Sequence, residues 1–166
     1  MTFARTKIQP PRSRAGLVER GSLHAQVAEA LATRAVVLFC APAGYGKTTL
    51  LAVEASRLPA DHAVAWVSAD PGDDLRRLAE CTLVALEPYD PPWRTAPEAL
   101  LATLGRGTDE AQREVAAEVI NTLDACDVSR GLIVFDDLHR VEDPAFFRFL
   151  DRLIERMSPR WTLALT

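Results

Sequence analysis

The chain has 166 residues, of which 48% are hydrophobic and 25% charged, and its formal net charge at pH 7 is −4. This length suits one domain with a buried core, and the acidic balance argues against nucleic-acid binding through overall charge. No apolar run approaches the roughly 20 residues of a membrane span, and no signal-peptide core stands at the N-terminus. We therefore expect a cytoplasmic protein without membrane contact, in which Cys40, Cys81 and Cys126 are reduced.

Residues 1–21 are expected to form a basic N-terminal arm ahead of a domain that covers residues 22–166. Four basic side chains precede the first acidic residue of the chain and are Arg5, Lys7, Arg12 and Arg14. Such an arm could touch a nucleotide, contact another domain or remain solvated. Ser22 is then expected to cap a helix with one apolar face.

A strand, a glycine-rich loop and a helix are expected in succession over residues 35–57. Residues 35–40 are Ala-Val-Val-Leu-Phe-Cys, an apolar run suited to a strand that is buried on both faces. Residues 41–49, Ala-Pro-Ala-Gly-Tyr-Gly-Lys-Thr-Thr, follow the pattern of a phosphate-binding loop, with Ala41 in place of the usual first glycine. The glycines let backbone N–H groups face phosphate oxygens, and the helix N-terminus adds positive potential.

This loop predicts binding of ATP or ADP with Mg²⁺. Lys47 is placed to reach the β- and γ-phosphates, and the Thr48 hydroxyl to ligate Mg²⁺. The expected nucleotide contacts in the loop are Pro42, Ala43, Gly44, Tyr45, Gly46, Lys47, Thr48 and Thr49. The alternative is an ordinary strand-to-helix turn that uses glycines for tightness, which would leave Lys47, Thr48 and Thr49 without a purpose.

The middle of the chain predicts a second buried strand and three helices. The strand covers residues 63–68, and Trp66 within it is expected in the core in preference to stacking on adenine. The helices are expected over residues 74–86, about 96–104 and 109–126. A capping box of Thr95 and Glu98 is expected to open the second helix. Prolines in residues 87–94 favour a loop before it.

Residues 131–135, Gly-Leu-Ile-Val-Phe, predict a third buried strand that is followed directly by Asp136 and Asp137. In a phosphate-loop fold, the strand that carries such a pair lies close to the loop. Asp136 is therefore expected to hold Mg²⁺ through water, and Asp137 to orient or deprotonate the attacking water. Lys47 and Asp137 are the candidate catalytic residues. The alternative is a strand that simply ends at a polar turn.

The last elements are a helix that Asp143 caps and Pro144 begins, and a strand over residues 161–165. Six apolar residues of this helix are expected to face a core: Phe146, Phe147, Leu150, Leu153, Ile154 and Met157. The alternation of strands and helices predicts an α/β fold of the P-loop NTPase class. We expect a three-layer parallel sheet with helices on both faces, truncated after the fourth strand.

Residues 42–50, 66–70 and 134–139 together resemble a known family. They are similar to the ATPase domain of the large ATP-binding transcriptional regulators of the LuxR type, which belong to the signal-transduction ATPases (STAND). The resemblance spans about residues 7–165 and accepts Ala41 at the start of the loop. It implies an ATP/ADP switch that is ADP-bound at rest and that oligomerises with ATP when an inducer arrives.

The resemblance also assigns residues. The loop glycines with Lys47, Thr48 and Thr49 match the phosphate and Mg²⁺ positions, while Asp136 and Asp137 match the metal and catalytic acids. His139 matches a family histidine that either fixes the turn or senses the γ-phosphate. Arg20, with its two preceding residues, matches a segment that packs near the adenine.

The family's sensor arginine, fifth strand, helical lid and DNA-binding module have no counterpart in these residues. Slow or absent hydrolysis and no direct nucleic-acid contact are therefore expected. A small-molecule kinase is a second possibility; Arg106 and Arg113 are its candidate lid arginines, and both also fit a solvated helix face. A third is a truncated, non-catalytic ATPase that pairs with itself or with other regulator domains through an open sheet edge or the basic arm.

Overall fold

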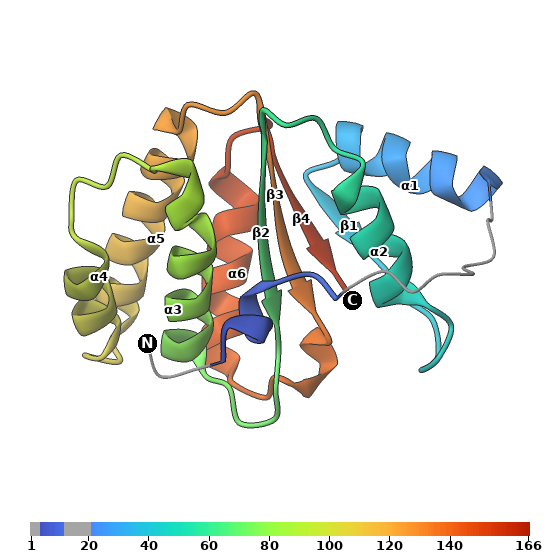
Figure 1. The fold of residues 1–166 in the computed structure, drawn as a ribbon. Helices are drawn as coiled ribbons and strands as arrows, with labels where there is room; N and C mark the ends of the chain where they lie inside the picture. The colour runs from blue at the N-terminus through green and yellow to red at the C-terminus, as the bar shows by residue number, and fades with distance from the viewer. Residues whose placement is uncertain (1–3, 12–20) are drawn as a thin grey trace.

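The computed structural model describes residues 4–11 and 21–166, which form a three-layer α/β fold (Figure 1). One parallel sheet has the strand order β1-β4-β3-β2. Its strands are β1 (Val36–Leu38), β2 (His62–Ser68), β3 (Arg130–Asp136) and β4 (Trp161–Leu165). The α-helices are α1 (Gly21–Thr33), α2 (Lys47–Ser56), α3 (Leu75–Leu86), α4 (Pro97–Leu104), α5 (Asp109–Ala125) and α6 (Pro144–Arg156). The predicted fold class, a parallel sheet between helices, is confirmed.

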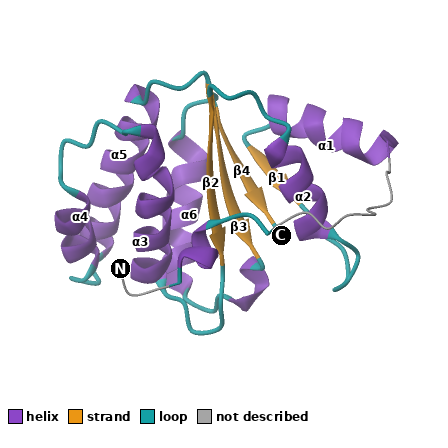
Figure 2. Ribbon diagram, viewed as in Figure 1, coloured by secondary structure: helices purple, strands orange, loops and turns teal. Residues whose placement is uncertain are grey.

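The sheet is apolar because both of its faces are covered. Figure 2 shows α1 and α2 on one face and the other helices on the opposite face. Along β3, Leu132 and Val134 belong to the core beneath α1 and α2, whereas Ile133 and Phe135 belong to the core shared with α3, α5 and α6. Trp66 of β2 is 1% exposed, so its predicted core position is confirmed. Burial on both sides explains the nearly continuous apolar sequence of the inner strands.

The register brings the carboxyl ends of the strands together along one side of the sheet, which we call its carboxyl edge. Leu165 of β4 pairs with Leu38 of β1 and with Phe135 of β3, and Ser68 of β2 pairs with Asp136. The loop after β1, the acids after β3 and the end of β4 therefore meet at this edge. In open parallel sheets, ligands bind at the carboxyl ends of the strands.

Strand β1 differs from the prediction that residues 35–40 are buried on both faces. Val36 and Val37 are only partly buried, and Leu38 is 69% exposed. Within the described ranges β1 pairs with β4 alone and lies at the edge of the sheet, so its outer side has no cover. An apolar run of this kind does not distinguish an edge strand from an inner one.

Helix starts were predicted with mixed success. The Asp143 carboxylate accepts a hydrogen bond from the N–H of Ala145 and caps α6, as predicted. The capping box is wrong, because α4 begins at Pro97 without a side-chain cap. Instead, the carboxylate of Glu118 in α5 accepts hydrogen bonds from the N–H groups before α4, including that of Thr95.

Two smaller predictions are also wrong. Ser22 lies inside α1, which begins at Gly21, and is therefore not its cap. Phe147 is 38% exposed, because the buried stripe of α6 passes through Phe146 and Leu150 and leaves Phe147 to one side. The prediction that residues 87–94 contain no α-helix or strand is confirmed, although the segment begins with a short 3₁₀ turn, η2 (Glu87–Tyr89).

The described part of the N-terminal arm packs on the domain. It contains the 3₁₀ turn η1 (Arg5–Ile8), and Lys7 Nζ lies 2.7 Å from Asp70 Oδ2 and 2.6 Å from Asp73 Oδ2. Burial alone would lower the pKa of Lys7, but the hydrogen bonds and charges of the two aspartates outweigh it and raise the pKa above 10.5. The alternative that the arm remains solvated is therefore wrong for Lys7, whose side chain is paired with two aspartates of the domain. The arm's Arg12 and Arg14 lie outside the described residues.

Cys40, Cys81 and Cys126 are free cysteines. No helix of the described ranges is both long and apolar enough to cross a membrane.

Candidate functional site

The glycine-rich loop connects β1 to α2 at the carboxyl edge of the sheet. Gly44 and Gly46 have φ of 82° and 81°, in the left-handed region that favours glycine. A Cβ atom at either position would meet no atom within 4 Å, so backbone conformation and not crowding explains these glycines. Gly46 is also the N-cap of α2 and supplies no side chain to bond the first N–H groups of the helix. Those N–H groups are suited to phosphate oxygens.

Lys47, the first residue of α2, folds back over the loop. Its Nζ donates hydrogen bonds to the carbonyl oxygens of Ala41 at 2.8 Å and Pro42 at 3.4 Å. The ammonium group is thereby held above the same loop whose N–H groups would face a phosphate.

Thr48 joins the loop to the acid at the end of β3. Its hydroxyl donates a 2.7 Å hydrogen bond to Asp136 Oδ1, between residues 88 positions apart in the chain. Asp136 is 4% exposed, and the same oxygen accepts a 2.6 Å bond from the Thr166 hydroxyl. The structure thus brings together the two residues that were expected to share Mg²⁺.

Asp137 turns away from the strand with a left-handed backbone, at φ 57°. Its N–H donates a 2.9 Å bond to the Thr166 hydroxyl, and its carboxylate is partly exposed. Arg140, at the end of the 3₁₀ turn η3 (Leu138–Arg140), places Nη2 3.5 Å from Asp137 Oδ2. This exposed pair holds the carboxylate loosely at the rim of the site.

These elements surround an open cleft of about 1090 Å³. The predicted residues that line it are Ala43, Gly44, Gly46, Lys47, Thr48, Thr49 and Asp137. His139 and Arg140 line it as well, and both are exposed. Pro42, Tyr45 and Asp136 are not part of the lining; Asp136 lies behind it, bonded to Thr48. Arg20 lies outside the described residues.

The donor groups suit Mg²⁺ when a nucleotide is bound. The described residues contain no group of three or more His, Cys, Asp or Glu that could hold a metal ion. Thr48 and Asp136 offer oxygen ligands only, which Mg²⁺ prefers, and protein Mg²⁺ sites commonly use one or two carboxylates completed by phosphate oxygens and water. A metal at this place would therefore depend on the phosphates of a ligand.

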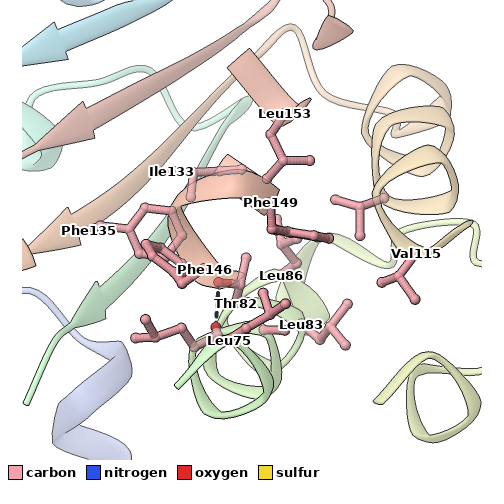
Figure 3. Close-up of a pocket in the computed structure, with 13 residues that line it drawn as sticks. Leu75, Thr82, Leu83, Leu86, Val115, Ile133, Phe135, Phe146, Phe149 and Leu153 are labelled. Atoms are coloured by element: carbon pink, nitrogen blue, oxygen red, sulfur yellow. Dashed lines mark hydrogen bonds between the residues drawn. The ribbon is translucent and has the colours of Figure 1, made fainter. Parts of the chain in front are cut away.

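A second cavity, of about 30 Å³, lies between β3, α3, α5 and α6 (Figure 3). Aliphatic and aromatic side chains such as Ile133, Phe135 and Phe149 surround it, and Thr82 is the polar residue of its lining. The Thr82 hydroxyl donates to the carbonyl of Leu78 in its own helix, so it offers little to a ligand. This space is a packing gap in the core and not a nucleotide site.

Several residues of the cleft were missed by the sequence analysis. Thr166, Leu38 and Phe147 all line it. Thr166 did carry a signal, since a polar residue directly after a buried parallel strand lies at the carboxyl edge of the sheet. Leu38 and Phe147 carried none, because both were expected in the core.

Comparison with known proteins agrees with this geometry. A family model described as an AAA domain matches residues 30–166. The chain is 33% identical over 144 residues to the serine/threonine-protein kinase PknK of two strains of Mycobacterium tuberculosis and of Mycobacterium bovis. These alignments cover 83% of this chain and only 12% of each relative, so the chain spans a small part of the relatives' length.

Proposed function

The chain belongs to the AAA domain family of P-loop NTPases, and on this premise we propose that it binds Mg-ATP and Mg-ADP as a switch domain of a LuxR-type transcriptional regulator. The observation that carries nucleotide binding is the 2.7 Å bond between Thr48 and Asp136, which joins the phosphate loop to the acid after β3. The regulatory part of the proposal rests on the resemblance of the three motifs. We also propose a cytoplasmic location, where free thiols persist.

The proposal assigns a role to the loop and to several polar residues in or near the cleft. The N–H groups of the loop and Lys47 bind the phosphates, for which Lys47 exchanges its carbonyl partners. Thr48 and Asp136 would hold Mg²⁺, which would neutralise part of the charge of the phosphates. Asp137 orients water, and Arg20 and Tyr45 are proposed to lie near the nucleotide.

Hydrolysis is proposed to be slow or absent. Arginines that stabilise the transferring phosphoryl group are worth about 10³–10⁵ in rate in P-loop enzymes. Arg140 lines the cleft, but it is paired with Asp137, the residue proposed to orient water. That pairing supports a domain that binds nucleotide better than it turns it over.

A small-molecule kinase receives no support from the two candidate lid arginines. Arg106 and Arg113 are exposed, neither lines the cleft, and Arg113 pairs with Asp109 one turn earlier in α5. The relatives are named kinases, but the aligned region covers only 12% of their length, so that activity is not carried over to this chain.

The interaction-module alternative does have an observation in its favour. The outer edge of β1 has no partner strand among the described residues, and Leu38 beside it is 69% exposed. We therefore keep self-association through this edge as a second candidate function, compatible with nucleotide binding.

Nucleotide binding is tested with the two lysines of the chain, Lys47 and Lys7. Mg-ATP at 100 times its Kd is expected to stabilise the wild-type protein by about 2.7 kcal/mol. Lys47→Ala is expected to abolish the accompanying rise in melting temperature. Lys7→Ala removes the other lysine, which pairs with Asp70 and Asp73 away from the loop, and is expected to keep the rise.

The measurement is thermal unfolding with and without Mg-ATP for all three proteins. Equal melting temperatures of the wild-type protein under both conditions would refute nucleotide binding.

A further inference from the structure

Thr166 follows β4 and binds four consecutive residues at the end of β3. Its N–H donates to the carbonyl of Phe135 at 3.1 Å, and its carbonyl accepts from the N–H of Leu138 at 2.9 Å. Its hydroxyl donates to Asp136 Oδ1 at 2.6 Å and accepts from the N–H of Asp137 at 2.9 Å. The backbone bonds continue the sheet, whereas the hydroxyl bonds reach only the two acids.

The chemistry of a hydroxyl explains why these two bonds belong together. A threonine hydroxyl has one proton to donate and lone pairs to accept. Giving the proton to Asp136 leaves a lone pair for the Asp137 N–H, so one group fixes both neighbours. Thr166 is 8% exposed, and water would replace these bonds poorly.

Two hydrogen bonds, one from Thr48 and one from Thr166, hold the Asp136 carboxylate in one orientation. Thr48 and Thr166 both donate to Oδ1, and no described residue donates a hydrogen bond to Oδ2. Oδ1 therefore anchors the carboxylate between the loop and β4, and Oδ2 is the oxygen available to a metal-bound water. Without Thr166, only Thr48 would restrain the carboxylate, and the left-handed turn at Asp137 would lose its N–H acceptor.

We propose that Thr166 is a positioning residue that couples Mg²⁺ to nucleotide binding by fixing Asp136 and Asp137 through its hydroxyl group. The inference rests on the proposed nucleotide site and adds a residue to it. Partners that orient metal-binding side chains commonly contribute about 10- to 100-fold to metal affinity.

The test compares Thr166→Val, which keeps the branched shape and removes the hydroxyl, with Thr166→Ser, which keeps the hydroxyl. Thr162→Val is the matched control. It makes the same change in β4, where the buried Thr162 hydroxyl donates to the carbonyls of Leu31 and Arg34, away from the acids. Calorimetry gives the Kd of ATP for each protein in Mg²⁺ and in EDTA, and the ratio of the two values measures the coupling.

Thr166→Val is expected to reduce the gain in ATP affinity from Mg²⁺ by roughly 10- to 100-fold, with the Kd in EDTA nearly unchanged. Thr166→Ser and Thr162→Val are expected to keep the wild-type ratio. A purely structural role would change the melting temperature of both valine variants and leave the ratio alone.

If folded Thr166→Val has the same ratio of Kd values in EDTA and in Mg²⁺ as the wild-type protein, the role of Thr166 is refuted, whereas the proposed nucleotide site is not. Absence of ATP binding by the wild-type protein instead overturns the proposed function. Should Thr166→Val fail to fold, Thr166→Ala, which adds no bulk to the buried position, gives the same comparison.

Discussion

At the scale of single residues, the site combines side chains whose freedom differs sharply. Asp136 is buried and held by two hydroxyl groups, whereas Asp137 is partly exposed and loosely paired with Arg140. A buried, doubly bonded acid suits a metal position, and a partly exposed acid suits a residue that contacts water. Adjacent aspartates in the sequence thus receive different physical roles from their surroundings.

Cys40 offers a direct probe of the cleft. It is exposed and lines the cleft, whereas burial raises the pKa of Cys81 to about 12 and also raises that of Cys126. A thiol reagent at neutral pH is therefore expected to label Cys40 first. If only the free form reacts, Mg-ATP at 100 times its Kd should slow this labelling about 100-fold by mass action.

Mass spectrometry of timed samples locates and measures the labelling. Cys40→Ser serves as the control and should lose the fast phase. An unchanged Cys40 rate in saturating Mg-ATP, or faster labelling of Cys81, would contradict the assignment of this cleft.

The sequence predicted those parts of the site that lie within short motifs. Thr48 and Asp136 were expected to lie close together, because a glycine-rich loop and a paired acid each carry a local pattern. Thr166 and Arg140 were not included, because their place depends on strand order and on a turn that reverses at Asp137. Whether such residues belong to the site depends on the arrangement of the elements in space and not on residue type.

At the scale of helices and strands, the inner strands pack so closely that β3 requires a glycine. A Cβ atom at Gly131 would fall within the ring of Trp161 in the adjacent β4. Trp161 is fully buried and its Nε1 donates a 2.8 Å bond to the carbonyl of Leu123 in α5. The ring therefore has no room to move aside.

Gly131→Ala is expected to lower the free energy of unfolding by about 1–3 kcal/mol, the usual cost of overpacking a core. Chemical denaturation measures this change. Gly21→Ala in α1 is the control, since a Cβ there meets no atom within 4 Å, and it should change stability by at most about 0.5 kcal/mol. Equal stability of the two variants would mean that Trp161 is not held as described.

Element boundaries were predictable where the signal is local. Periodicity placed the long helices to within about a residue, and Asp143 marked the start of α6. The start of α4 was not predictable, because the N–H groups of Arg94 and Thr95, just before the helix, bond Glu118 of α5. The edge position of β1 was not predictable either, since edge and inner strands share an apolar composition.

At the scale of the whole molecule, the docked η1 turn and the open edge of β1 lie at opposite sides of the sheet. Lys7 ties η1 beside β2, so that edge is covered by the chain itself. β1 has no comparable cover among the described residues. Any association through sheet edges is therefore expected at β1.

We expect weak, concentration-dependent association that is stronger in Mg-ATP and lost in Leu38→Asp, which places a charge at the end of β1. Because Leu38 also lines the cleft, the association is expected to be lost in this variant without nucleotide as well. Analytical ultracentrifugation with and without nucleotide measures it. Stable interfaces usually bury at least about 1,000 Å², so a three-residue strand alone suits a transient contact. A monomer at all concentrations, in Mg-ATP as well as without it, would speak against the interaction-module candidate.

The strand order also has a consequence for synthesis on the ribosome. Within the described residues β1 joins the sheet only through β4, which is separated from it by more than a hundred residues of chain. The strand that leads into the phosphate loop is therefore expected to stay unpaired until residues 161–165 have left the exit tunnel. A nascent chain that stops short of them would carry the complete loop motif on a strand that has no partner in the sheet.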